Sequence, residues 1–290
     1  MKSYKIVENR KIWFGLSLVI ILAGLFCLIT NGLNWGIDFT GGSILQYNVN
    51  SSYDLKDVRQ VLDTFNLSDY DTKKAGDNKQ ELIIRTVELD NDKQNEITNA
   101  LKQKFPKLVL VRADKVDAVI GKELQRQAVL ALIIANIGML IYISFRFEFR
   151  SALAAIIALV HDVLVLISIF AIFRIPVDIN FVAALLAIVG YSINDTIVIF
   201  DRVRENLKLM HKTAFSDVIN ESIAQTMSRT INTSLTTLIA VVTLFIFGGE
   251  TIRDFTLALI VGITSGTYSS IFLACPLWAM FRGDPKTAKA

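Results

Sequence analysis

Six long apolar runs dominate the hydropathy pattern of the chain. A helix needs about 20 mostly apolar residues to cross the hydrocarbon core of a bilayer, and each run is close to that length. The fifth run is short unless it begins near Thr230, and the last is long enough to leave the membrane near Pro276. We therefore predict six transmembrane helices, at Ile12–Thr30, Gln127–Phe145, Ala152–Phe173, Phe181–Phe200, Thr233–Phe247 and Phe255–Phe281.

The segment between the first two runs has the alternating pattern of a water-soluble domain. Alternation of apolar and polar residues indicates strands, and apolar residues recurring every three or four positions indicate helices. The pattern predicts strands at Ser43–Val49, Ser68–Lys74, Glu81–Val87 and Lys107–Lys115, and helices at Leu55–Phe65 and Asp92–Phe105. The order β-α-β-β-α-β is typical of a ferredoxin-like α+β domain.

Local signals refine this domain. Asp77-Asn78 is expected to turn the chain between the two middle strands, and Pro106 to end the second helix. Val116–Arg126 is expected to continue as a helix into the second span. The predicted fold class is a multi-span α-helical membrane protein, with six transmembrane helices and one external ferredoxin-like domain between the first and second helices.

Lys and Arg residues are strongly biased to one side of the predicted spans. If the N-terminus is cytoplasmic, the short loops on the outer side hold only Arg174 and Arg253. The positive-inside rule then places both termini in the cytoplasm, the domain of residues 31–126 outside, and the loop of residues 201–232 inside. The cytoplasmic side receives Lys2, Lys5, Arg10, Lys11, Arg146, Arg150, Arg202, Arg204, Lys208, Lys212, Arg229, Arg282, Lys286 and Lys289.

This division gives three parts: residues 1–30, 31–126 and 127–290. The first holds the cytoplasmic N-terminus and the first helix, and the last holds a five-helix bundle with a cytoplasmic C-terminus. Within the loop of residues 201–232, Ser216 has the character of an N-cap, and Phe215, Ile219 and Ile223 share one helical face. The loop is therefore predicted to form a short amphipathic helix at the membrane surface.

Composition narrows the function classes. Hydrophobic residues make up 52% of the chain, and the net charge is only +3. Charges in the external domain nearly balance, so it has no basic face for nucleic acid. Cys27 and Cys275 both lie in apolar runs, and the external domain contains no cysteine, which excludes a disulfide framework. No phosphate-binding loop, nucleophile with a base, or Cys/His metal spacing is present. We expect no enzyme activity, cofactor or metal.

Ionisable residues interrupt two of the apolar runs. Asp195, beside Asn194, lies six residues before Asp201 and so about 9 Å from the inner end of its helix. His161 and Asp162 lie about ten residues into the third span, at a depth of about 15 Å. Charged groups at such depths cost roughly 2.5–3.5 kcal/mol on insertion scales. Asp195 either joins spans structurally or handles a proton or ion, and both functions are also open for His161 and Asp162.

Arg229 begins the fifth span at a depth that can match Asp195. Taken alone, Arg229 is explained by the positive-inside rule. Its depth also makes an ion pair with Asp195 geometrically possible. Burial favours a neutral acid, whereas a guanidinium nearby favours its charged form. An acid balanced in this way can load and release a proton. A proton is favoured over a metal ion, because calcium would need a set of several oxygen ligands that is not apparent.

Small and hydroxylated residues occur at regular spacings. The last span carries two small-xxx-small pairs, which favour close helix packing: Gly262 with Gly266, and Ser265 with Ser269. Hydroxyls crowd the start of the fifth span, where they either bond to their own helix or line a wet path: Thr230, Thr233, Ser234, Thr236 and Thr237. After the first span, Gly36, Gly41 and Gly42 are predicted to form a hinge into the first strand.

Several motifs together resemble the SecF family of protein-export subunits, within the resistance-nodulation-division superfamily. The resemblance extends along the whole chain and is strongest in the membrane motifs. They are GIDFTGG (Gly36–Gly42), HDV (His161–Val163), GYSINDTIVIFDRVREN (Gly190–Asn206), SRTINTSLTTL (Ser228–Leu238), FGG (Phe247–Gly249) and GTYSSIF (Gly266–Phe272). The external domain matches the family in size and element order rather than in motif.

The resemblance implies a protein of the bacterial inner membrane that uses the proton-motive force to promote late steps of polypeptide export. It implies SecD and the SecYEG channel as partners, with YajC as a further one and the exported unfolded polypeptide as the moving chain. The family's intramembrane acid falls on Asp195, within Asn194–Thr196, and its partner arginine on Arg229. A further relay aspartate belongs to the SecD half, so this chain alone cannot form the full path.

Two other functions stay open. An independent small-molecule or lipid transporter of the same superfamily would need a second six-span half and a larger external region. A scaffold that only holds a channel complex together would leave Asp195 without a purpose.

Overall fold

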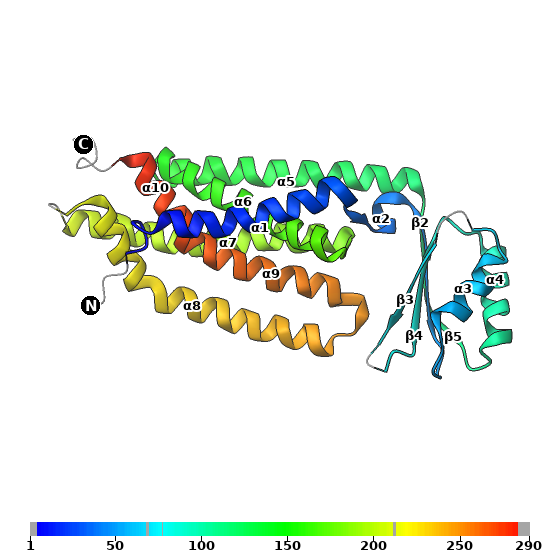
Figure 1. The fold of residues 1–290 in the computed structure, drawn as a ribbon. Coiled ribbons are helices and arrows are strands. Elements are labelled where there is room, and N and C mark those ends of the chain that lie inside the picture. Colours follow the sequence, from blue (N-terminus) through cyan, green and yellow to red (C-terminus); the bar gives the residue numbers. More distant parts are fainter. Residues whose placement is uncertain (1–4, 68–69, 77, 211–212, 284–290) are drawn as a thin grey trace. The chain divides into compact units, whose positions relative to one another are not determined.

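The structure, a computed structural model, describes residues 5–67, 70–76, 78–210 and 213–283 (Figure 1). The chain forms two compact units. A helical unit contains Met1–Asn34, Leu130–Pro176 and Asn180–Ala290, and an αβ unit contains Trp35–Val129 and Val177–Ile179. The boundaries predicted from sequence, 1–30, 31–126 and 127–290, stay a proposal for the functional division of the chain.

In the described part of the chain, six helices are long and apolar enough to cross a membrane, as predicted. Five are single helices: α1 (Arg10–Asn31), α5 (Ala118–Arg146), α6 (Phe149–Phe173), α7 (Ile179–Leu209) and α8 (Phe215–Phe247). The sixth spans Glu250–Arg282 and is made of η1 (Glu250–Ile252), α9 (Arg253–Ser269), η2 (Ser270–Ala274) and α10 (Cys275–Arg282). The predicted helical continuation before the second span is confirmed, because α5 begins at Ala118.

Two predictions about helix ends are wrong. Ser216 is not an N-cap, since α8 begins at Phe215 and Ala214 occupies the cap position. The predicted short amphipathic helix is not separate from the fifth span: one 33-residue helix contains both. No Gly or Pro lies within Phe215–Phe247 to break the helix, and its amphipathic turns are held by buried Ile219 and Ile223.

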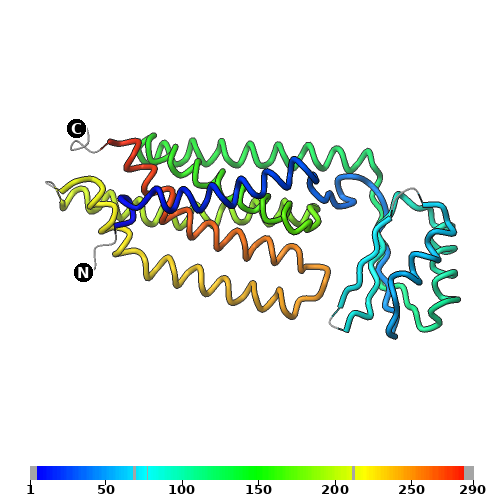
Figure 2. Tube along the Cα trace, viewed as in Figure 1, coloured from blue at the N-terminus to red at the C-terminus, as the bar shows by residue number. Residues whose placement is uncertain are grey.

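The sixth span is interrupted by a π-helical turn, η2, just before Pro276. Proline has no N–H to donate and its ring crowds the preceding turn, so a regular α-helix is not favoured there. The turn is stabilised by Cys275, whose thiol donates to the Ser270 carbonyl at 3.2 Å. Figure 2 shows that α1 begins and α10 ends at the same end of the helical unit.

The αβ unit has the predicted order of elements. Its strands are β2 (Gly42–Asn48), β3 (Tyr70–Ala75), β4 (Glu81–Thr86) and β5 (Val109–Val116), and its helices are α3 (Leu55–Asp63) and α4 (Asn91–Lys104). The strands pair antiparallel in the order β3-β4-β2-β5, the ferredoxin-like arrangement. Ser68 of the predicted second strand and Asp77 of the predicted turn lie outside the described residues.

The core of the αβ unit follows from its two periodicities. Leu45 and Tyr47 of β2 alternate toward the same face as Leu82 and Ile84 of β4, and all four side chains are fully buried. The helices cover this face with Val58, Leu62, Ile97 and Leu101. Each helix has an acidic N-cap: Asp54 accepts from the Lys56 N–H at 3.1 Å, and Asp90 from the Lys93 N–H at 2.8 Å.

The glycine-rich segment forms a tight corner in the αβ unit. It contains the single helical turn α2 (Ile37–Thr40), followed by Gly41 and Gly42, whose φ angles of +75° and +134° favour glycine. A Cβ atom on Gly41 would lie 2.6 Å from the Ala118 Cα atom, and one on Gly42 would lie 2.5 Å from the Thr86 carbonyl oxygen. Gly36 donates its N–H to the Val177 carbonyl at 2.7 Å.

We expect Gly41→Ala to destabilise the αβ unit by about 1–3 kcal/mol, because alanine at this φ is strained and its methyl group would clash with Ala118. Thermal unfolding of the purified chain measures the effect. Gly138→Ala is the matched control, since no atom lies within 4 Å of a Cβ there. Equal unfolding temperatures for the two variants would contradict the packing argument.

Candidate functional site

A polar centre lies inside the helical unit, between α6, α7 and the sixth span. His161 and Asp162 of α6 and Asp195 of α7 are buried, with exposed fractions of 6%, 1% and 3%. The sequence predicted these residues as candidate site residues because ionisable groups are rare deep within apolar spans. The structure adds their partners, which come from elements distant in the sequence.

Asp162 accepts hydrogen bonds from four side chains. Its Oδ2 atom accepts from the Ser192 and Ser269 hydroxyls, both at 2.7 Å. Its Oδ1 atom accepts from the Ser265 hydroxyl at 2.7 Å and pairs with the Nδ1 atom of His161 at 3.2 Å. An ionised carboxylate offers about four acceptor positions, so this side chain is saturated. The arrangement satisfies both carboxyl oxygens of Asp162 within the apolar unit.

Glycines bring the serines of α9 close to Asp162. A Cβ atom on Gly262 would lie 2.2 Å from Ile188 of α7, and one on Gly266 would lie 2.8 Å from the Cβ atom of Ser192. Of the four small residues predicted for helix packing, the glycines lie against α7, while Ser265 and Ser269 donate to Asp162. Ser192 was not predicted as a site residue. Its position three residues before Asp195 on the same helix could have indicated a place near the buried acids.

Asp195 has a sparser environment than Asp162. Its Oδ2 atom accepts from the Ser234 hydroxyl of α8 at 3.2 Å, and that hydroxyl also bonds to the Thr267 hydroxyl of α9 at 2.7 Å. The neighbouring Thr196 bonds to the Ser270 hydroxyl at 2.8 Å. Asn194 is exposed on the outer face of α7. Asp195 and Thr196 therefore connect α7 with both α8 and the sixth span.

Arg229 does not contact Asp195 in this arrangement. No ion pair between the two was found among the described residues, and Arg229 lies exposed on α8. Five residues separate Arg229 from Ser234, which means about 7.5 Å along the helix and about 140° around it. Ser234, rather than Arg229, is the α8 side chain that bonds to Asp195.

Most hydroxyls at this end of α8 bond to their own helix, which is one of the two predicted alternatives. Thr233, Thr236 and Thr237 each donate to a carbonyl three or four residues earlier. Ser234 bonds across to α7 and α9, and Thr237 also accepts from the Tyr191 hydroxyl of α7 at 3.2 Å. The Thr230 hydroxyl is buried with no hydrogen-bond partner among the described residues.

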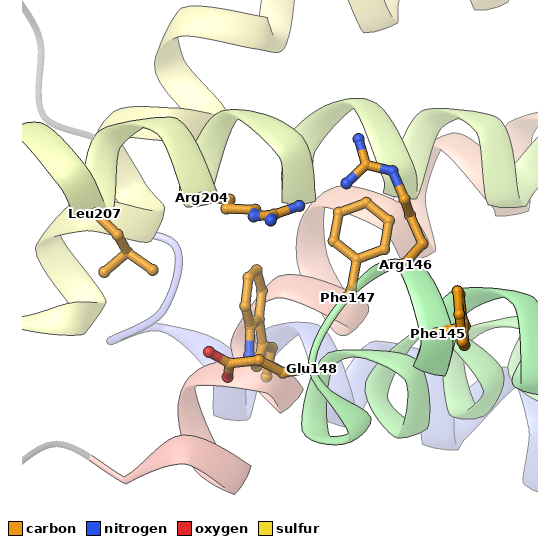
Figure 3. A pocket seen from close by; sticks show the side chains of 7 residues that line it. Phe145, Arg146, Phe147, Glu148, Arg204 and Leu207 are labelled. Atoms are coloured by element: carbon orange, nitrogen blue, oxygen red, sulfur yellow. The ribbon is translucent and has the colours of Figure 1, made fainter.

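A cavity of about 370 Å³ lies elsewhere in the helical unit and contains none of the predicted site residues. It is lined by Phe145, Arg146, Phe147, Glu148, Arg204, Leu207 and Trp278 (Figure 3). Arg146 pairs with Asp201 at 3.5 Å, and Glu148 with Arg282 at 3.5 Å. Within the described ranges, no cluster of three or more His, Cys, Asp or Glu side chains could hold a metal ion.

Together, these features define a class: a multi-span helical membrane protein with an α+β unit inserted between its first two long helices and buried acids among its spans. Comparison with known proteins narrows the class. A model of the C-terminal region of SecD/SecF protein export membrane proteins matches residues 96–284, and a model of the SecD/SecF GG motif matches residues 28–52. The chain belongs to the SecF family of protein translocase subunits, which are not enzymes.

Individual relatives agree with this assignment. Protein translocase subunit SecF of Sebaldella termitidis is 43% identical, over 98% of this chain and 94% of the relative. Protein translocase subunit SecDF of Bacillus subtilis is 37% identical, over 97% of this chain but 38% of the relative. The crystal structure of SecDF from Thermus thermophilus is similar with a TM-score of 0.89 and 32% identity, over 97% of this chain and 39% of that one. This chain thus spans about two fifths of the SecDF chains.

Gly266→Leu is expected to destabilise the helical unit by about 1–3 kcal/mol, because a larger side chain would push Ser192 away from Asp162. The measurement is the thermal unfolding temperature in detergent micelles. Gly190→Leu on α7 is the control, with no atom within 4 Å of its Cβ position. If the Gly266→Leu protein were as stable as the control, α9 would not depend on this close contact.

Proposed function

We propose that this SecF subunit, which works with SecD in protein export, uses the proton-motive force to promote late steps of polypeptide export. The observation that carries the proposal is the position of Asp195. This acid is buried within a span and has one hydroxyl donor from α8, whereas Asp162 has four donors. A carboxyl group with so few donors is poorly stabilised when charged and is suited to taking up a proton.

The proposed step uses α8 as the moving part. With Ser234 beside Asp195, the acid lacks a compensating charge and binds a proton. When α8 shifts so that Arg229 approaches, the guanidinium stabilises the carboxylate and the proton leaves. The membrane potential supplies about 2.3 kcal/mol per charge for each 100 mV, enough to drive a change of one or two powers of ten in proton affinity. Asn194 and Thr196 flank the acid and complete this proposed relay.

The proposed partners follow from the relatives. SecDF relatives carry both halves in one chain, so SecD is expected to supply the second half, with its own acid, here. We further propose that the complex acts beside SecYEG, with YajC as an additional partner, on an unfolded polypeptide in transit. Gly36, Gly41 and Gly42, just after the boundary between the two units at Asn34, form the proposed hinge for movement of the αβ unit.

We place the protein in the bacterial inner membrane with both termini cytoplasmic. The Lys and Arg bias supports this orientation, and so does the common end of the helical unit at which α1 begins and α10 ends (Figure 2). A small-molecule or lipid transporter is the alternative function. The family membership weighs against it.

Replacing Asp195 by Asn keeps the shape of the side chain and removes its titration. In inverted membrane vesicles that contain SecD, we expect Asp195→Asn to abolish the stimulation of export by a proton gradient while assembly with SecD is unchanged. Asp201→Asn is the matched control, because Asp201 lies on the same helix and pairs with Arg146 at 3.5 Å. A normal gradient response in Asp195→Asn vesicles would make Asp195 a structural residue.

The orientation is tested by labelling single cysteines with a membrane-impermeant reagent, after replacement of Cys27 and Cys275. Asp77 and Lys212 would test the two sides of the membrane, but both lie outside the described residues. Lys79 and Lys208 replace them, since both are exposed. We expect Lys79→Cys to react from outside intact cells and Lys208→Cys only after the membrane is opened. Reaction of both from outside would overturn the orientation.

A further inference from the structure

The cavity of about 370 Å³ between the α5–α6 loop, α7 and α10 has walls that are fixed by core packing (Figure 3). Phe147 of the loop packs on Phe200, with ring centroids 6.4 Å apart, and Phe200 packs on Trp278 at 4.6 Å. Phe200 and Trp278 are buried in the core of the helical unit, and Phe147 packs against that core. The shape of the cavity therefore does not depend on a ligand.

Two arginines line this cavity, and one of them has no acidic partner. Arg146 ends α5, and its Nη2 atom lies 3.5 Å from the Oδ1 atom of Asp201, which is longer than a good hydrogen bond. The side chain of Arg204 on α7 makes no hydrogen bond or ion pair with any described residue, and it points toward the α5–α6 loop (Figure 3). Each guanidinium offers five donors in a planar fork that fits the oxygens of a phosphate group. The cavity therefore has more donors than acceptors.

The acids close to the cavity are matched by other cations. Glu148 is the acidic side chain in the lining, and its Oε1 atom lies 3.5 Å from the Nη1 atom of Arg282. Glu205, next to Arg204 in the chain, pairs with Arg202 at 2.7 Å. The charge of Arg204 is thus not balanced by a described acid, and the cavity favours a ligand with a net negative charge.

An exposed apolar face of α5 leads to the cavity. Phe145 lines the cavity, yet its exposed fraction is 96%. From Ile134 to Phe145 the helix advances by about 16 Å, close to the half-thickness of about 15 Å of the hydrocarbon core of a bilayer. This face can therefore hold an acyl chain of one leaflet. Its exposed side chains lie three or four residues apart, at Ile134, Ile137, Ile141 and Phe145.

We propose that the cavity binds the phosphodiester head group of an anionic phospholipid, with one acyl chain along the exposed face of α5. Arg204 and Arg146 donate to the phosphate oxygens. A soluble anion would leave Phe145 uncovered, whereas a zwitterionic lipid would bring its own cationic group close to the unpaired Arg204. Basic pockets between spans at the membrane surface are suited to anionic head groups for the same reason.

The proposal does not rest on the proton coupling proposed above. A phosphate held by both arginines would join the end of α5 to α7, two helices whose charged side chains meet here in the single long contact between Arg146 and Asp201. With both termini cytoplasmic, as proposed above, the lipid belongs to the inner leaflet. Its binding can be measured without an export assay.

Native mass spectrometry of the full-length chain, released from detergent micelles, tests the proposal. Phosphatidylglycerol and phosphatidylcholine with identical acyl chains are added separately. We expect one phosphatidylglycerol to be retained with about tenfold higher affinity than phosphatidylcholine, as expected for hydrogen bonds between charged partners. Equal affinities for the two lipids would overturn the proposal. Displacement of phosphatidylglycerol by an equal concentration of inorganic phosphate would also overturn it, because the site would then take a soluble anion.

Replacing Arg204 by Gln tests the head-group contact. Arg204→Gln is expected to weaken phosphatidylglycerol binding about tenfold and to leave phosphatidylcholine binding unchanged. Arg202→Gln is the matched control, since it removes the same charge from α7 at a side chain already held by Glu205 and Gln225. Equal losses of affinity in the two variants would show a general effect of charge and contradict the assignment of Arg204.

Replacing Phe145 by Ser tests the acyl-chain contact. We expect Phe145→Ser to weaken phosphatidylglycerol binding, while Phe173→Ser, at the exposed far end of α6, leaves it unchanged. Thermal unfolding temperatures equal to that of the unmodified chain establish that both variants are folded. Undiminished binding in Phe145→Ser would exclude a lipid seated along α5. The complex with SecD should show the same preference for phosphatidylglycerol, and loss of that preference in the complex would overturn the site.

Discussion

A carboxylate inside an apolar helical bundle has to be matched by donors, and Asp162 takes them from three segments. Uncompensated burial of a charge costs several kcal/mol, so the positions of these donors are tightly constrained. Ser192 has to come from α7 and Ser265 and Ser269 from α9. The close approach at Gly262 and Gly266 meets this requirement, and so does the serine spacing on α9. The arrangement of α6, α7 and α9 depends on this one group.

The two buried acids, Asp162 and Asp195, differ in how many hydrogen-bond partners they have. Asp162 has four hydrogen-bond partners and no free acceptor position, which makes it a structural centre. Asp195 has the Ser234 hydroxyl, and that hydroxyl is shared with Thr267. Helix α7 thus carries Ser192, which donates to Asp162, and three residues later Asp195, which has a single donor. The donor to one buried acid and the other buried acid are separated by less than one helical turn.

Sequence patterns predicted the features that depend on local order. The six spans follow from the length of apolar runs, and the αβ unit follows from its two periodicities and its turn residues. The donors of Asp162 could not be predicted in the same way, because the lipid-facing and inward-facing sides of a span are both apolar, and hydropathy does not define the rotation of a helix. Ser265 and Ser269 were recognised as small residues but not as hydrogen-bond donors. The continuity of α8 was missed because its polar turns looked like a loop.

The unbroken α8 has a consequence for how this family can vary. Asn220 near its start holds the segment before α1 by accepting the N–H groups of Ile6 and Val7, at 3.1 and 3.2 Å, and Ser234 further along bonds to Asp195. One residue inserted between them would turn everything beyond it by about 100° and advance it by about 1.5 Å. No loop lies between these two contacts to absorb the change. Homologous chains should therefore keep the length of Asn220–Ser234 constant, while insertions and deletions accumulate at chain ends and in turns.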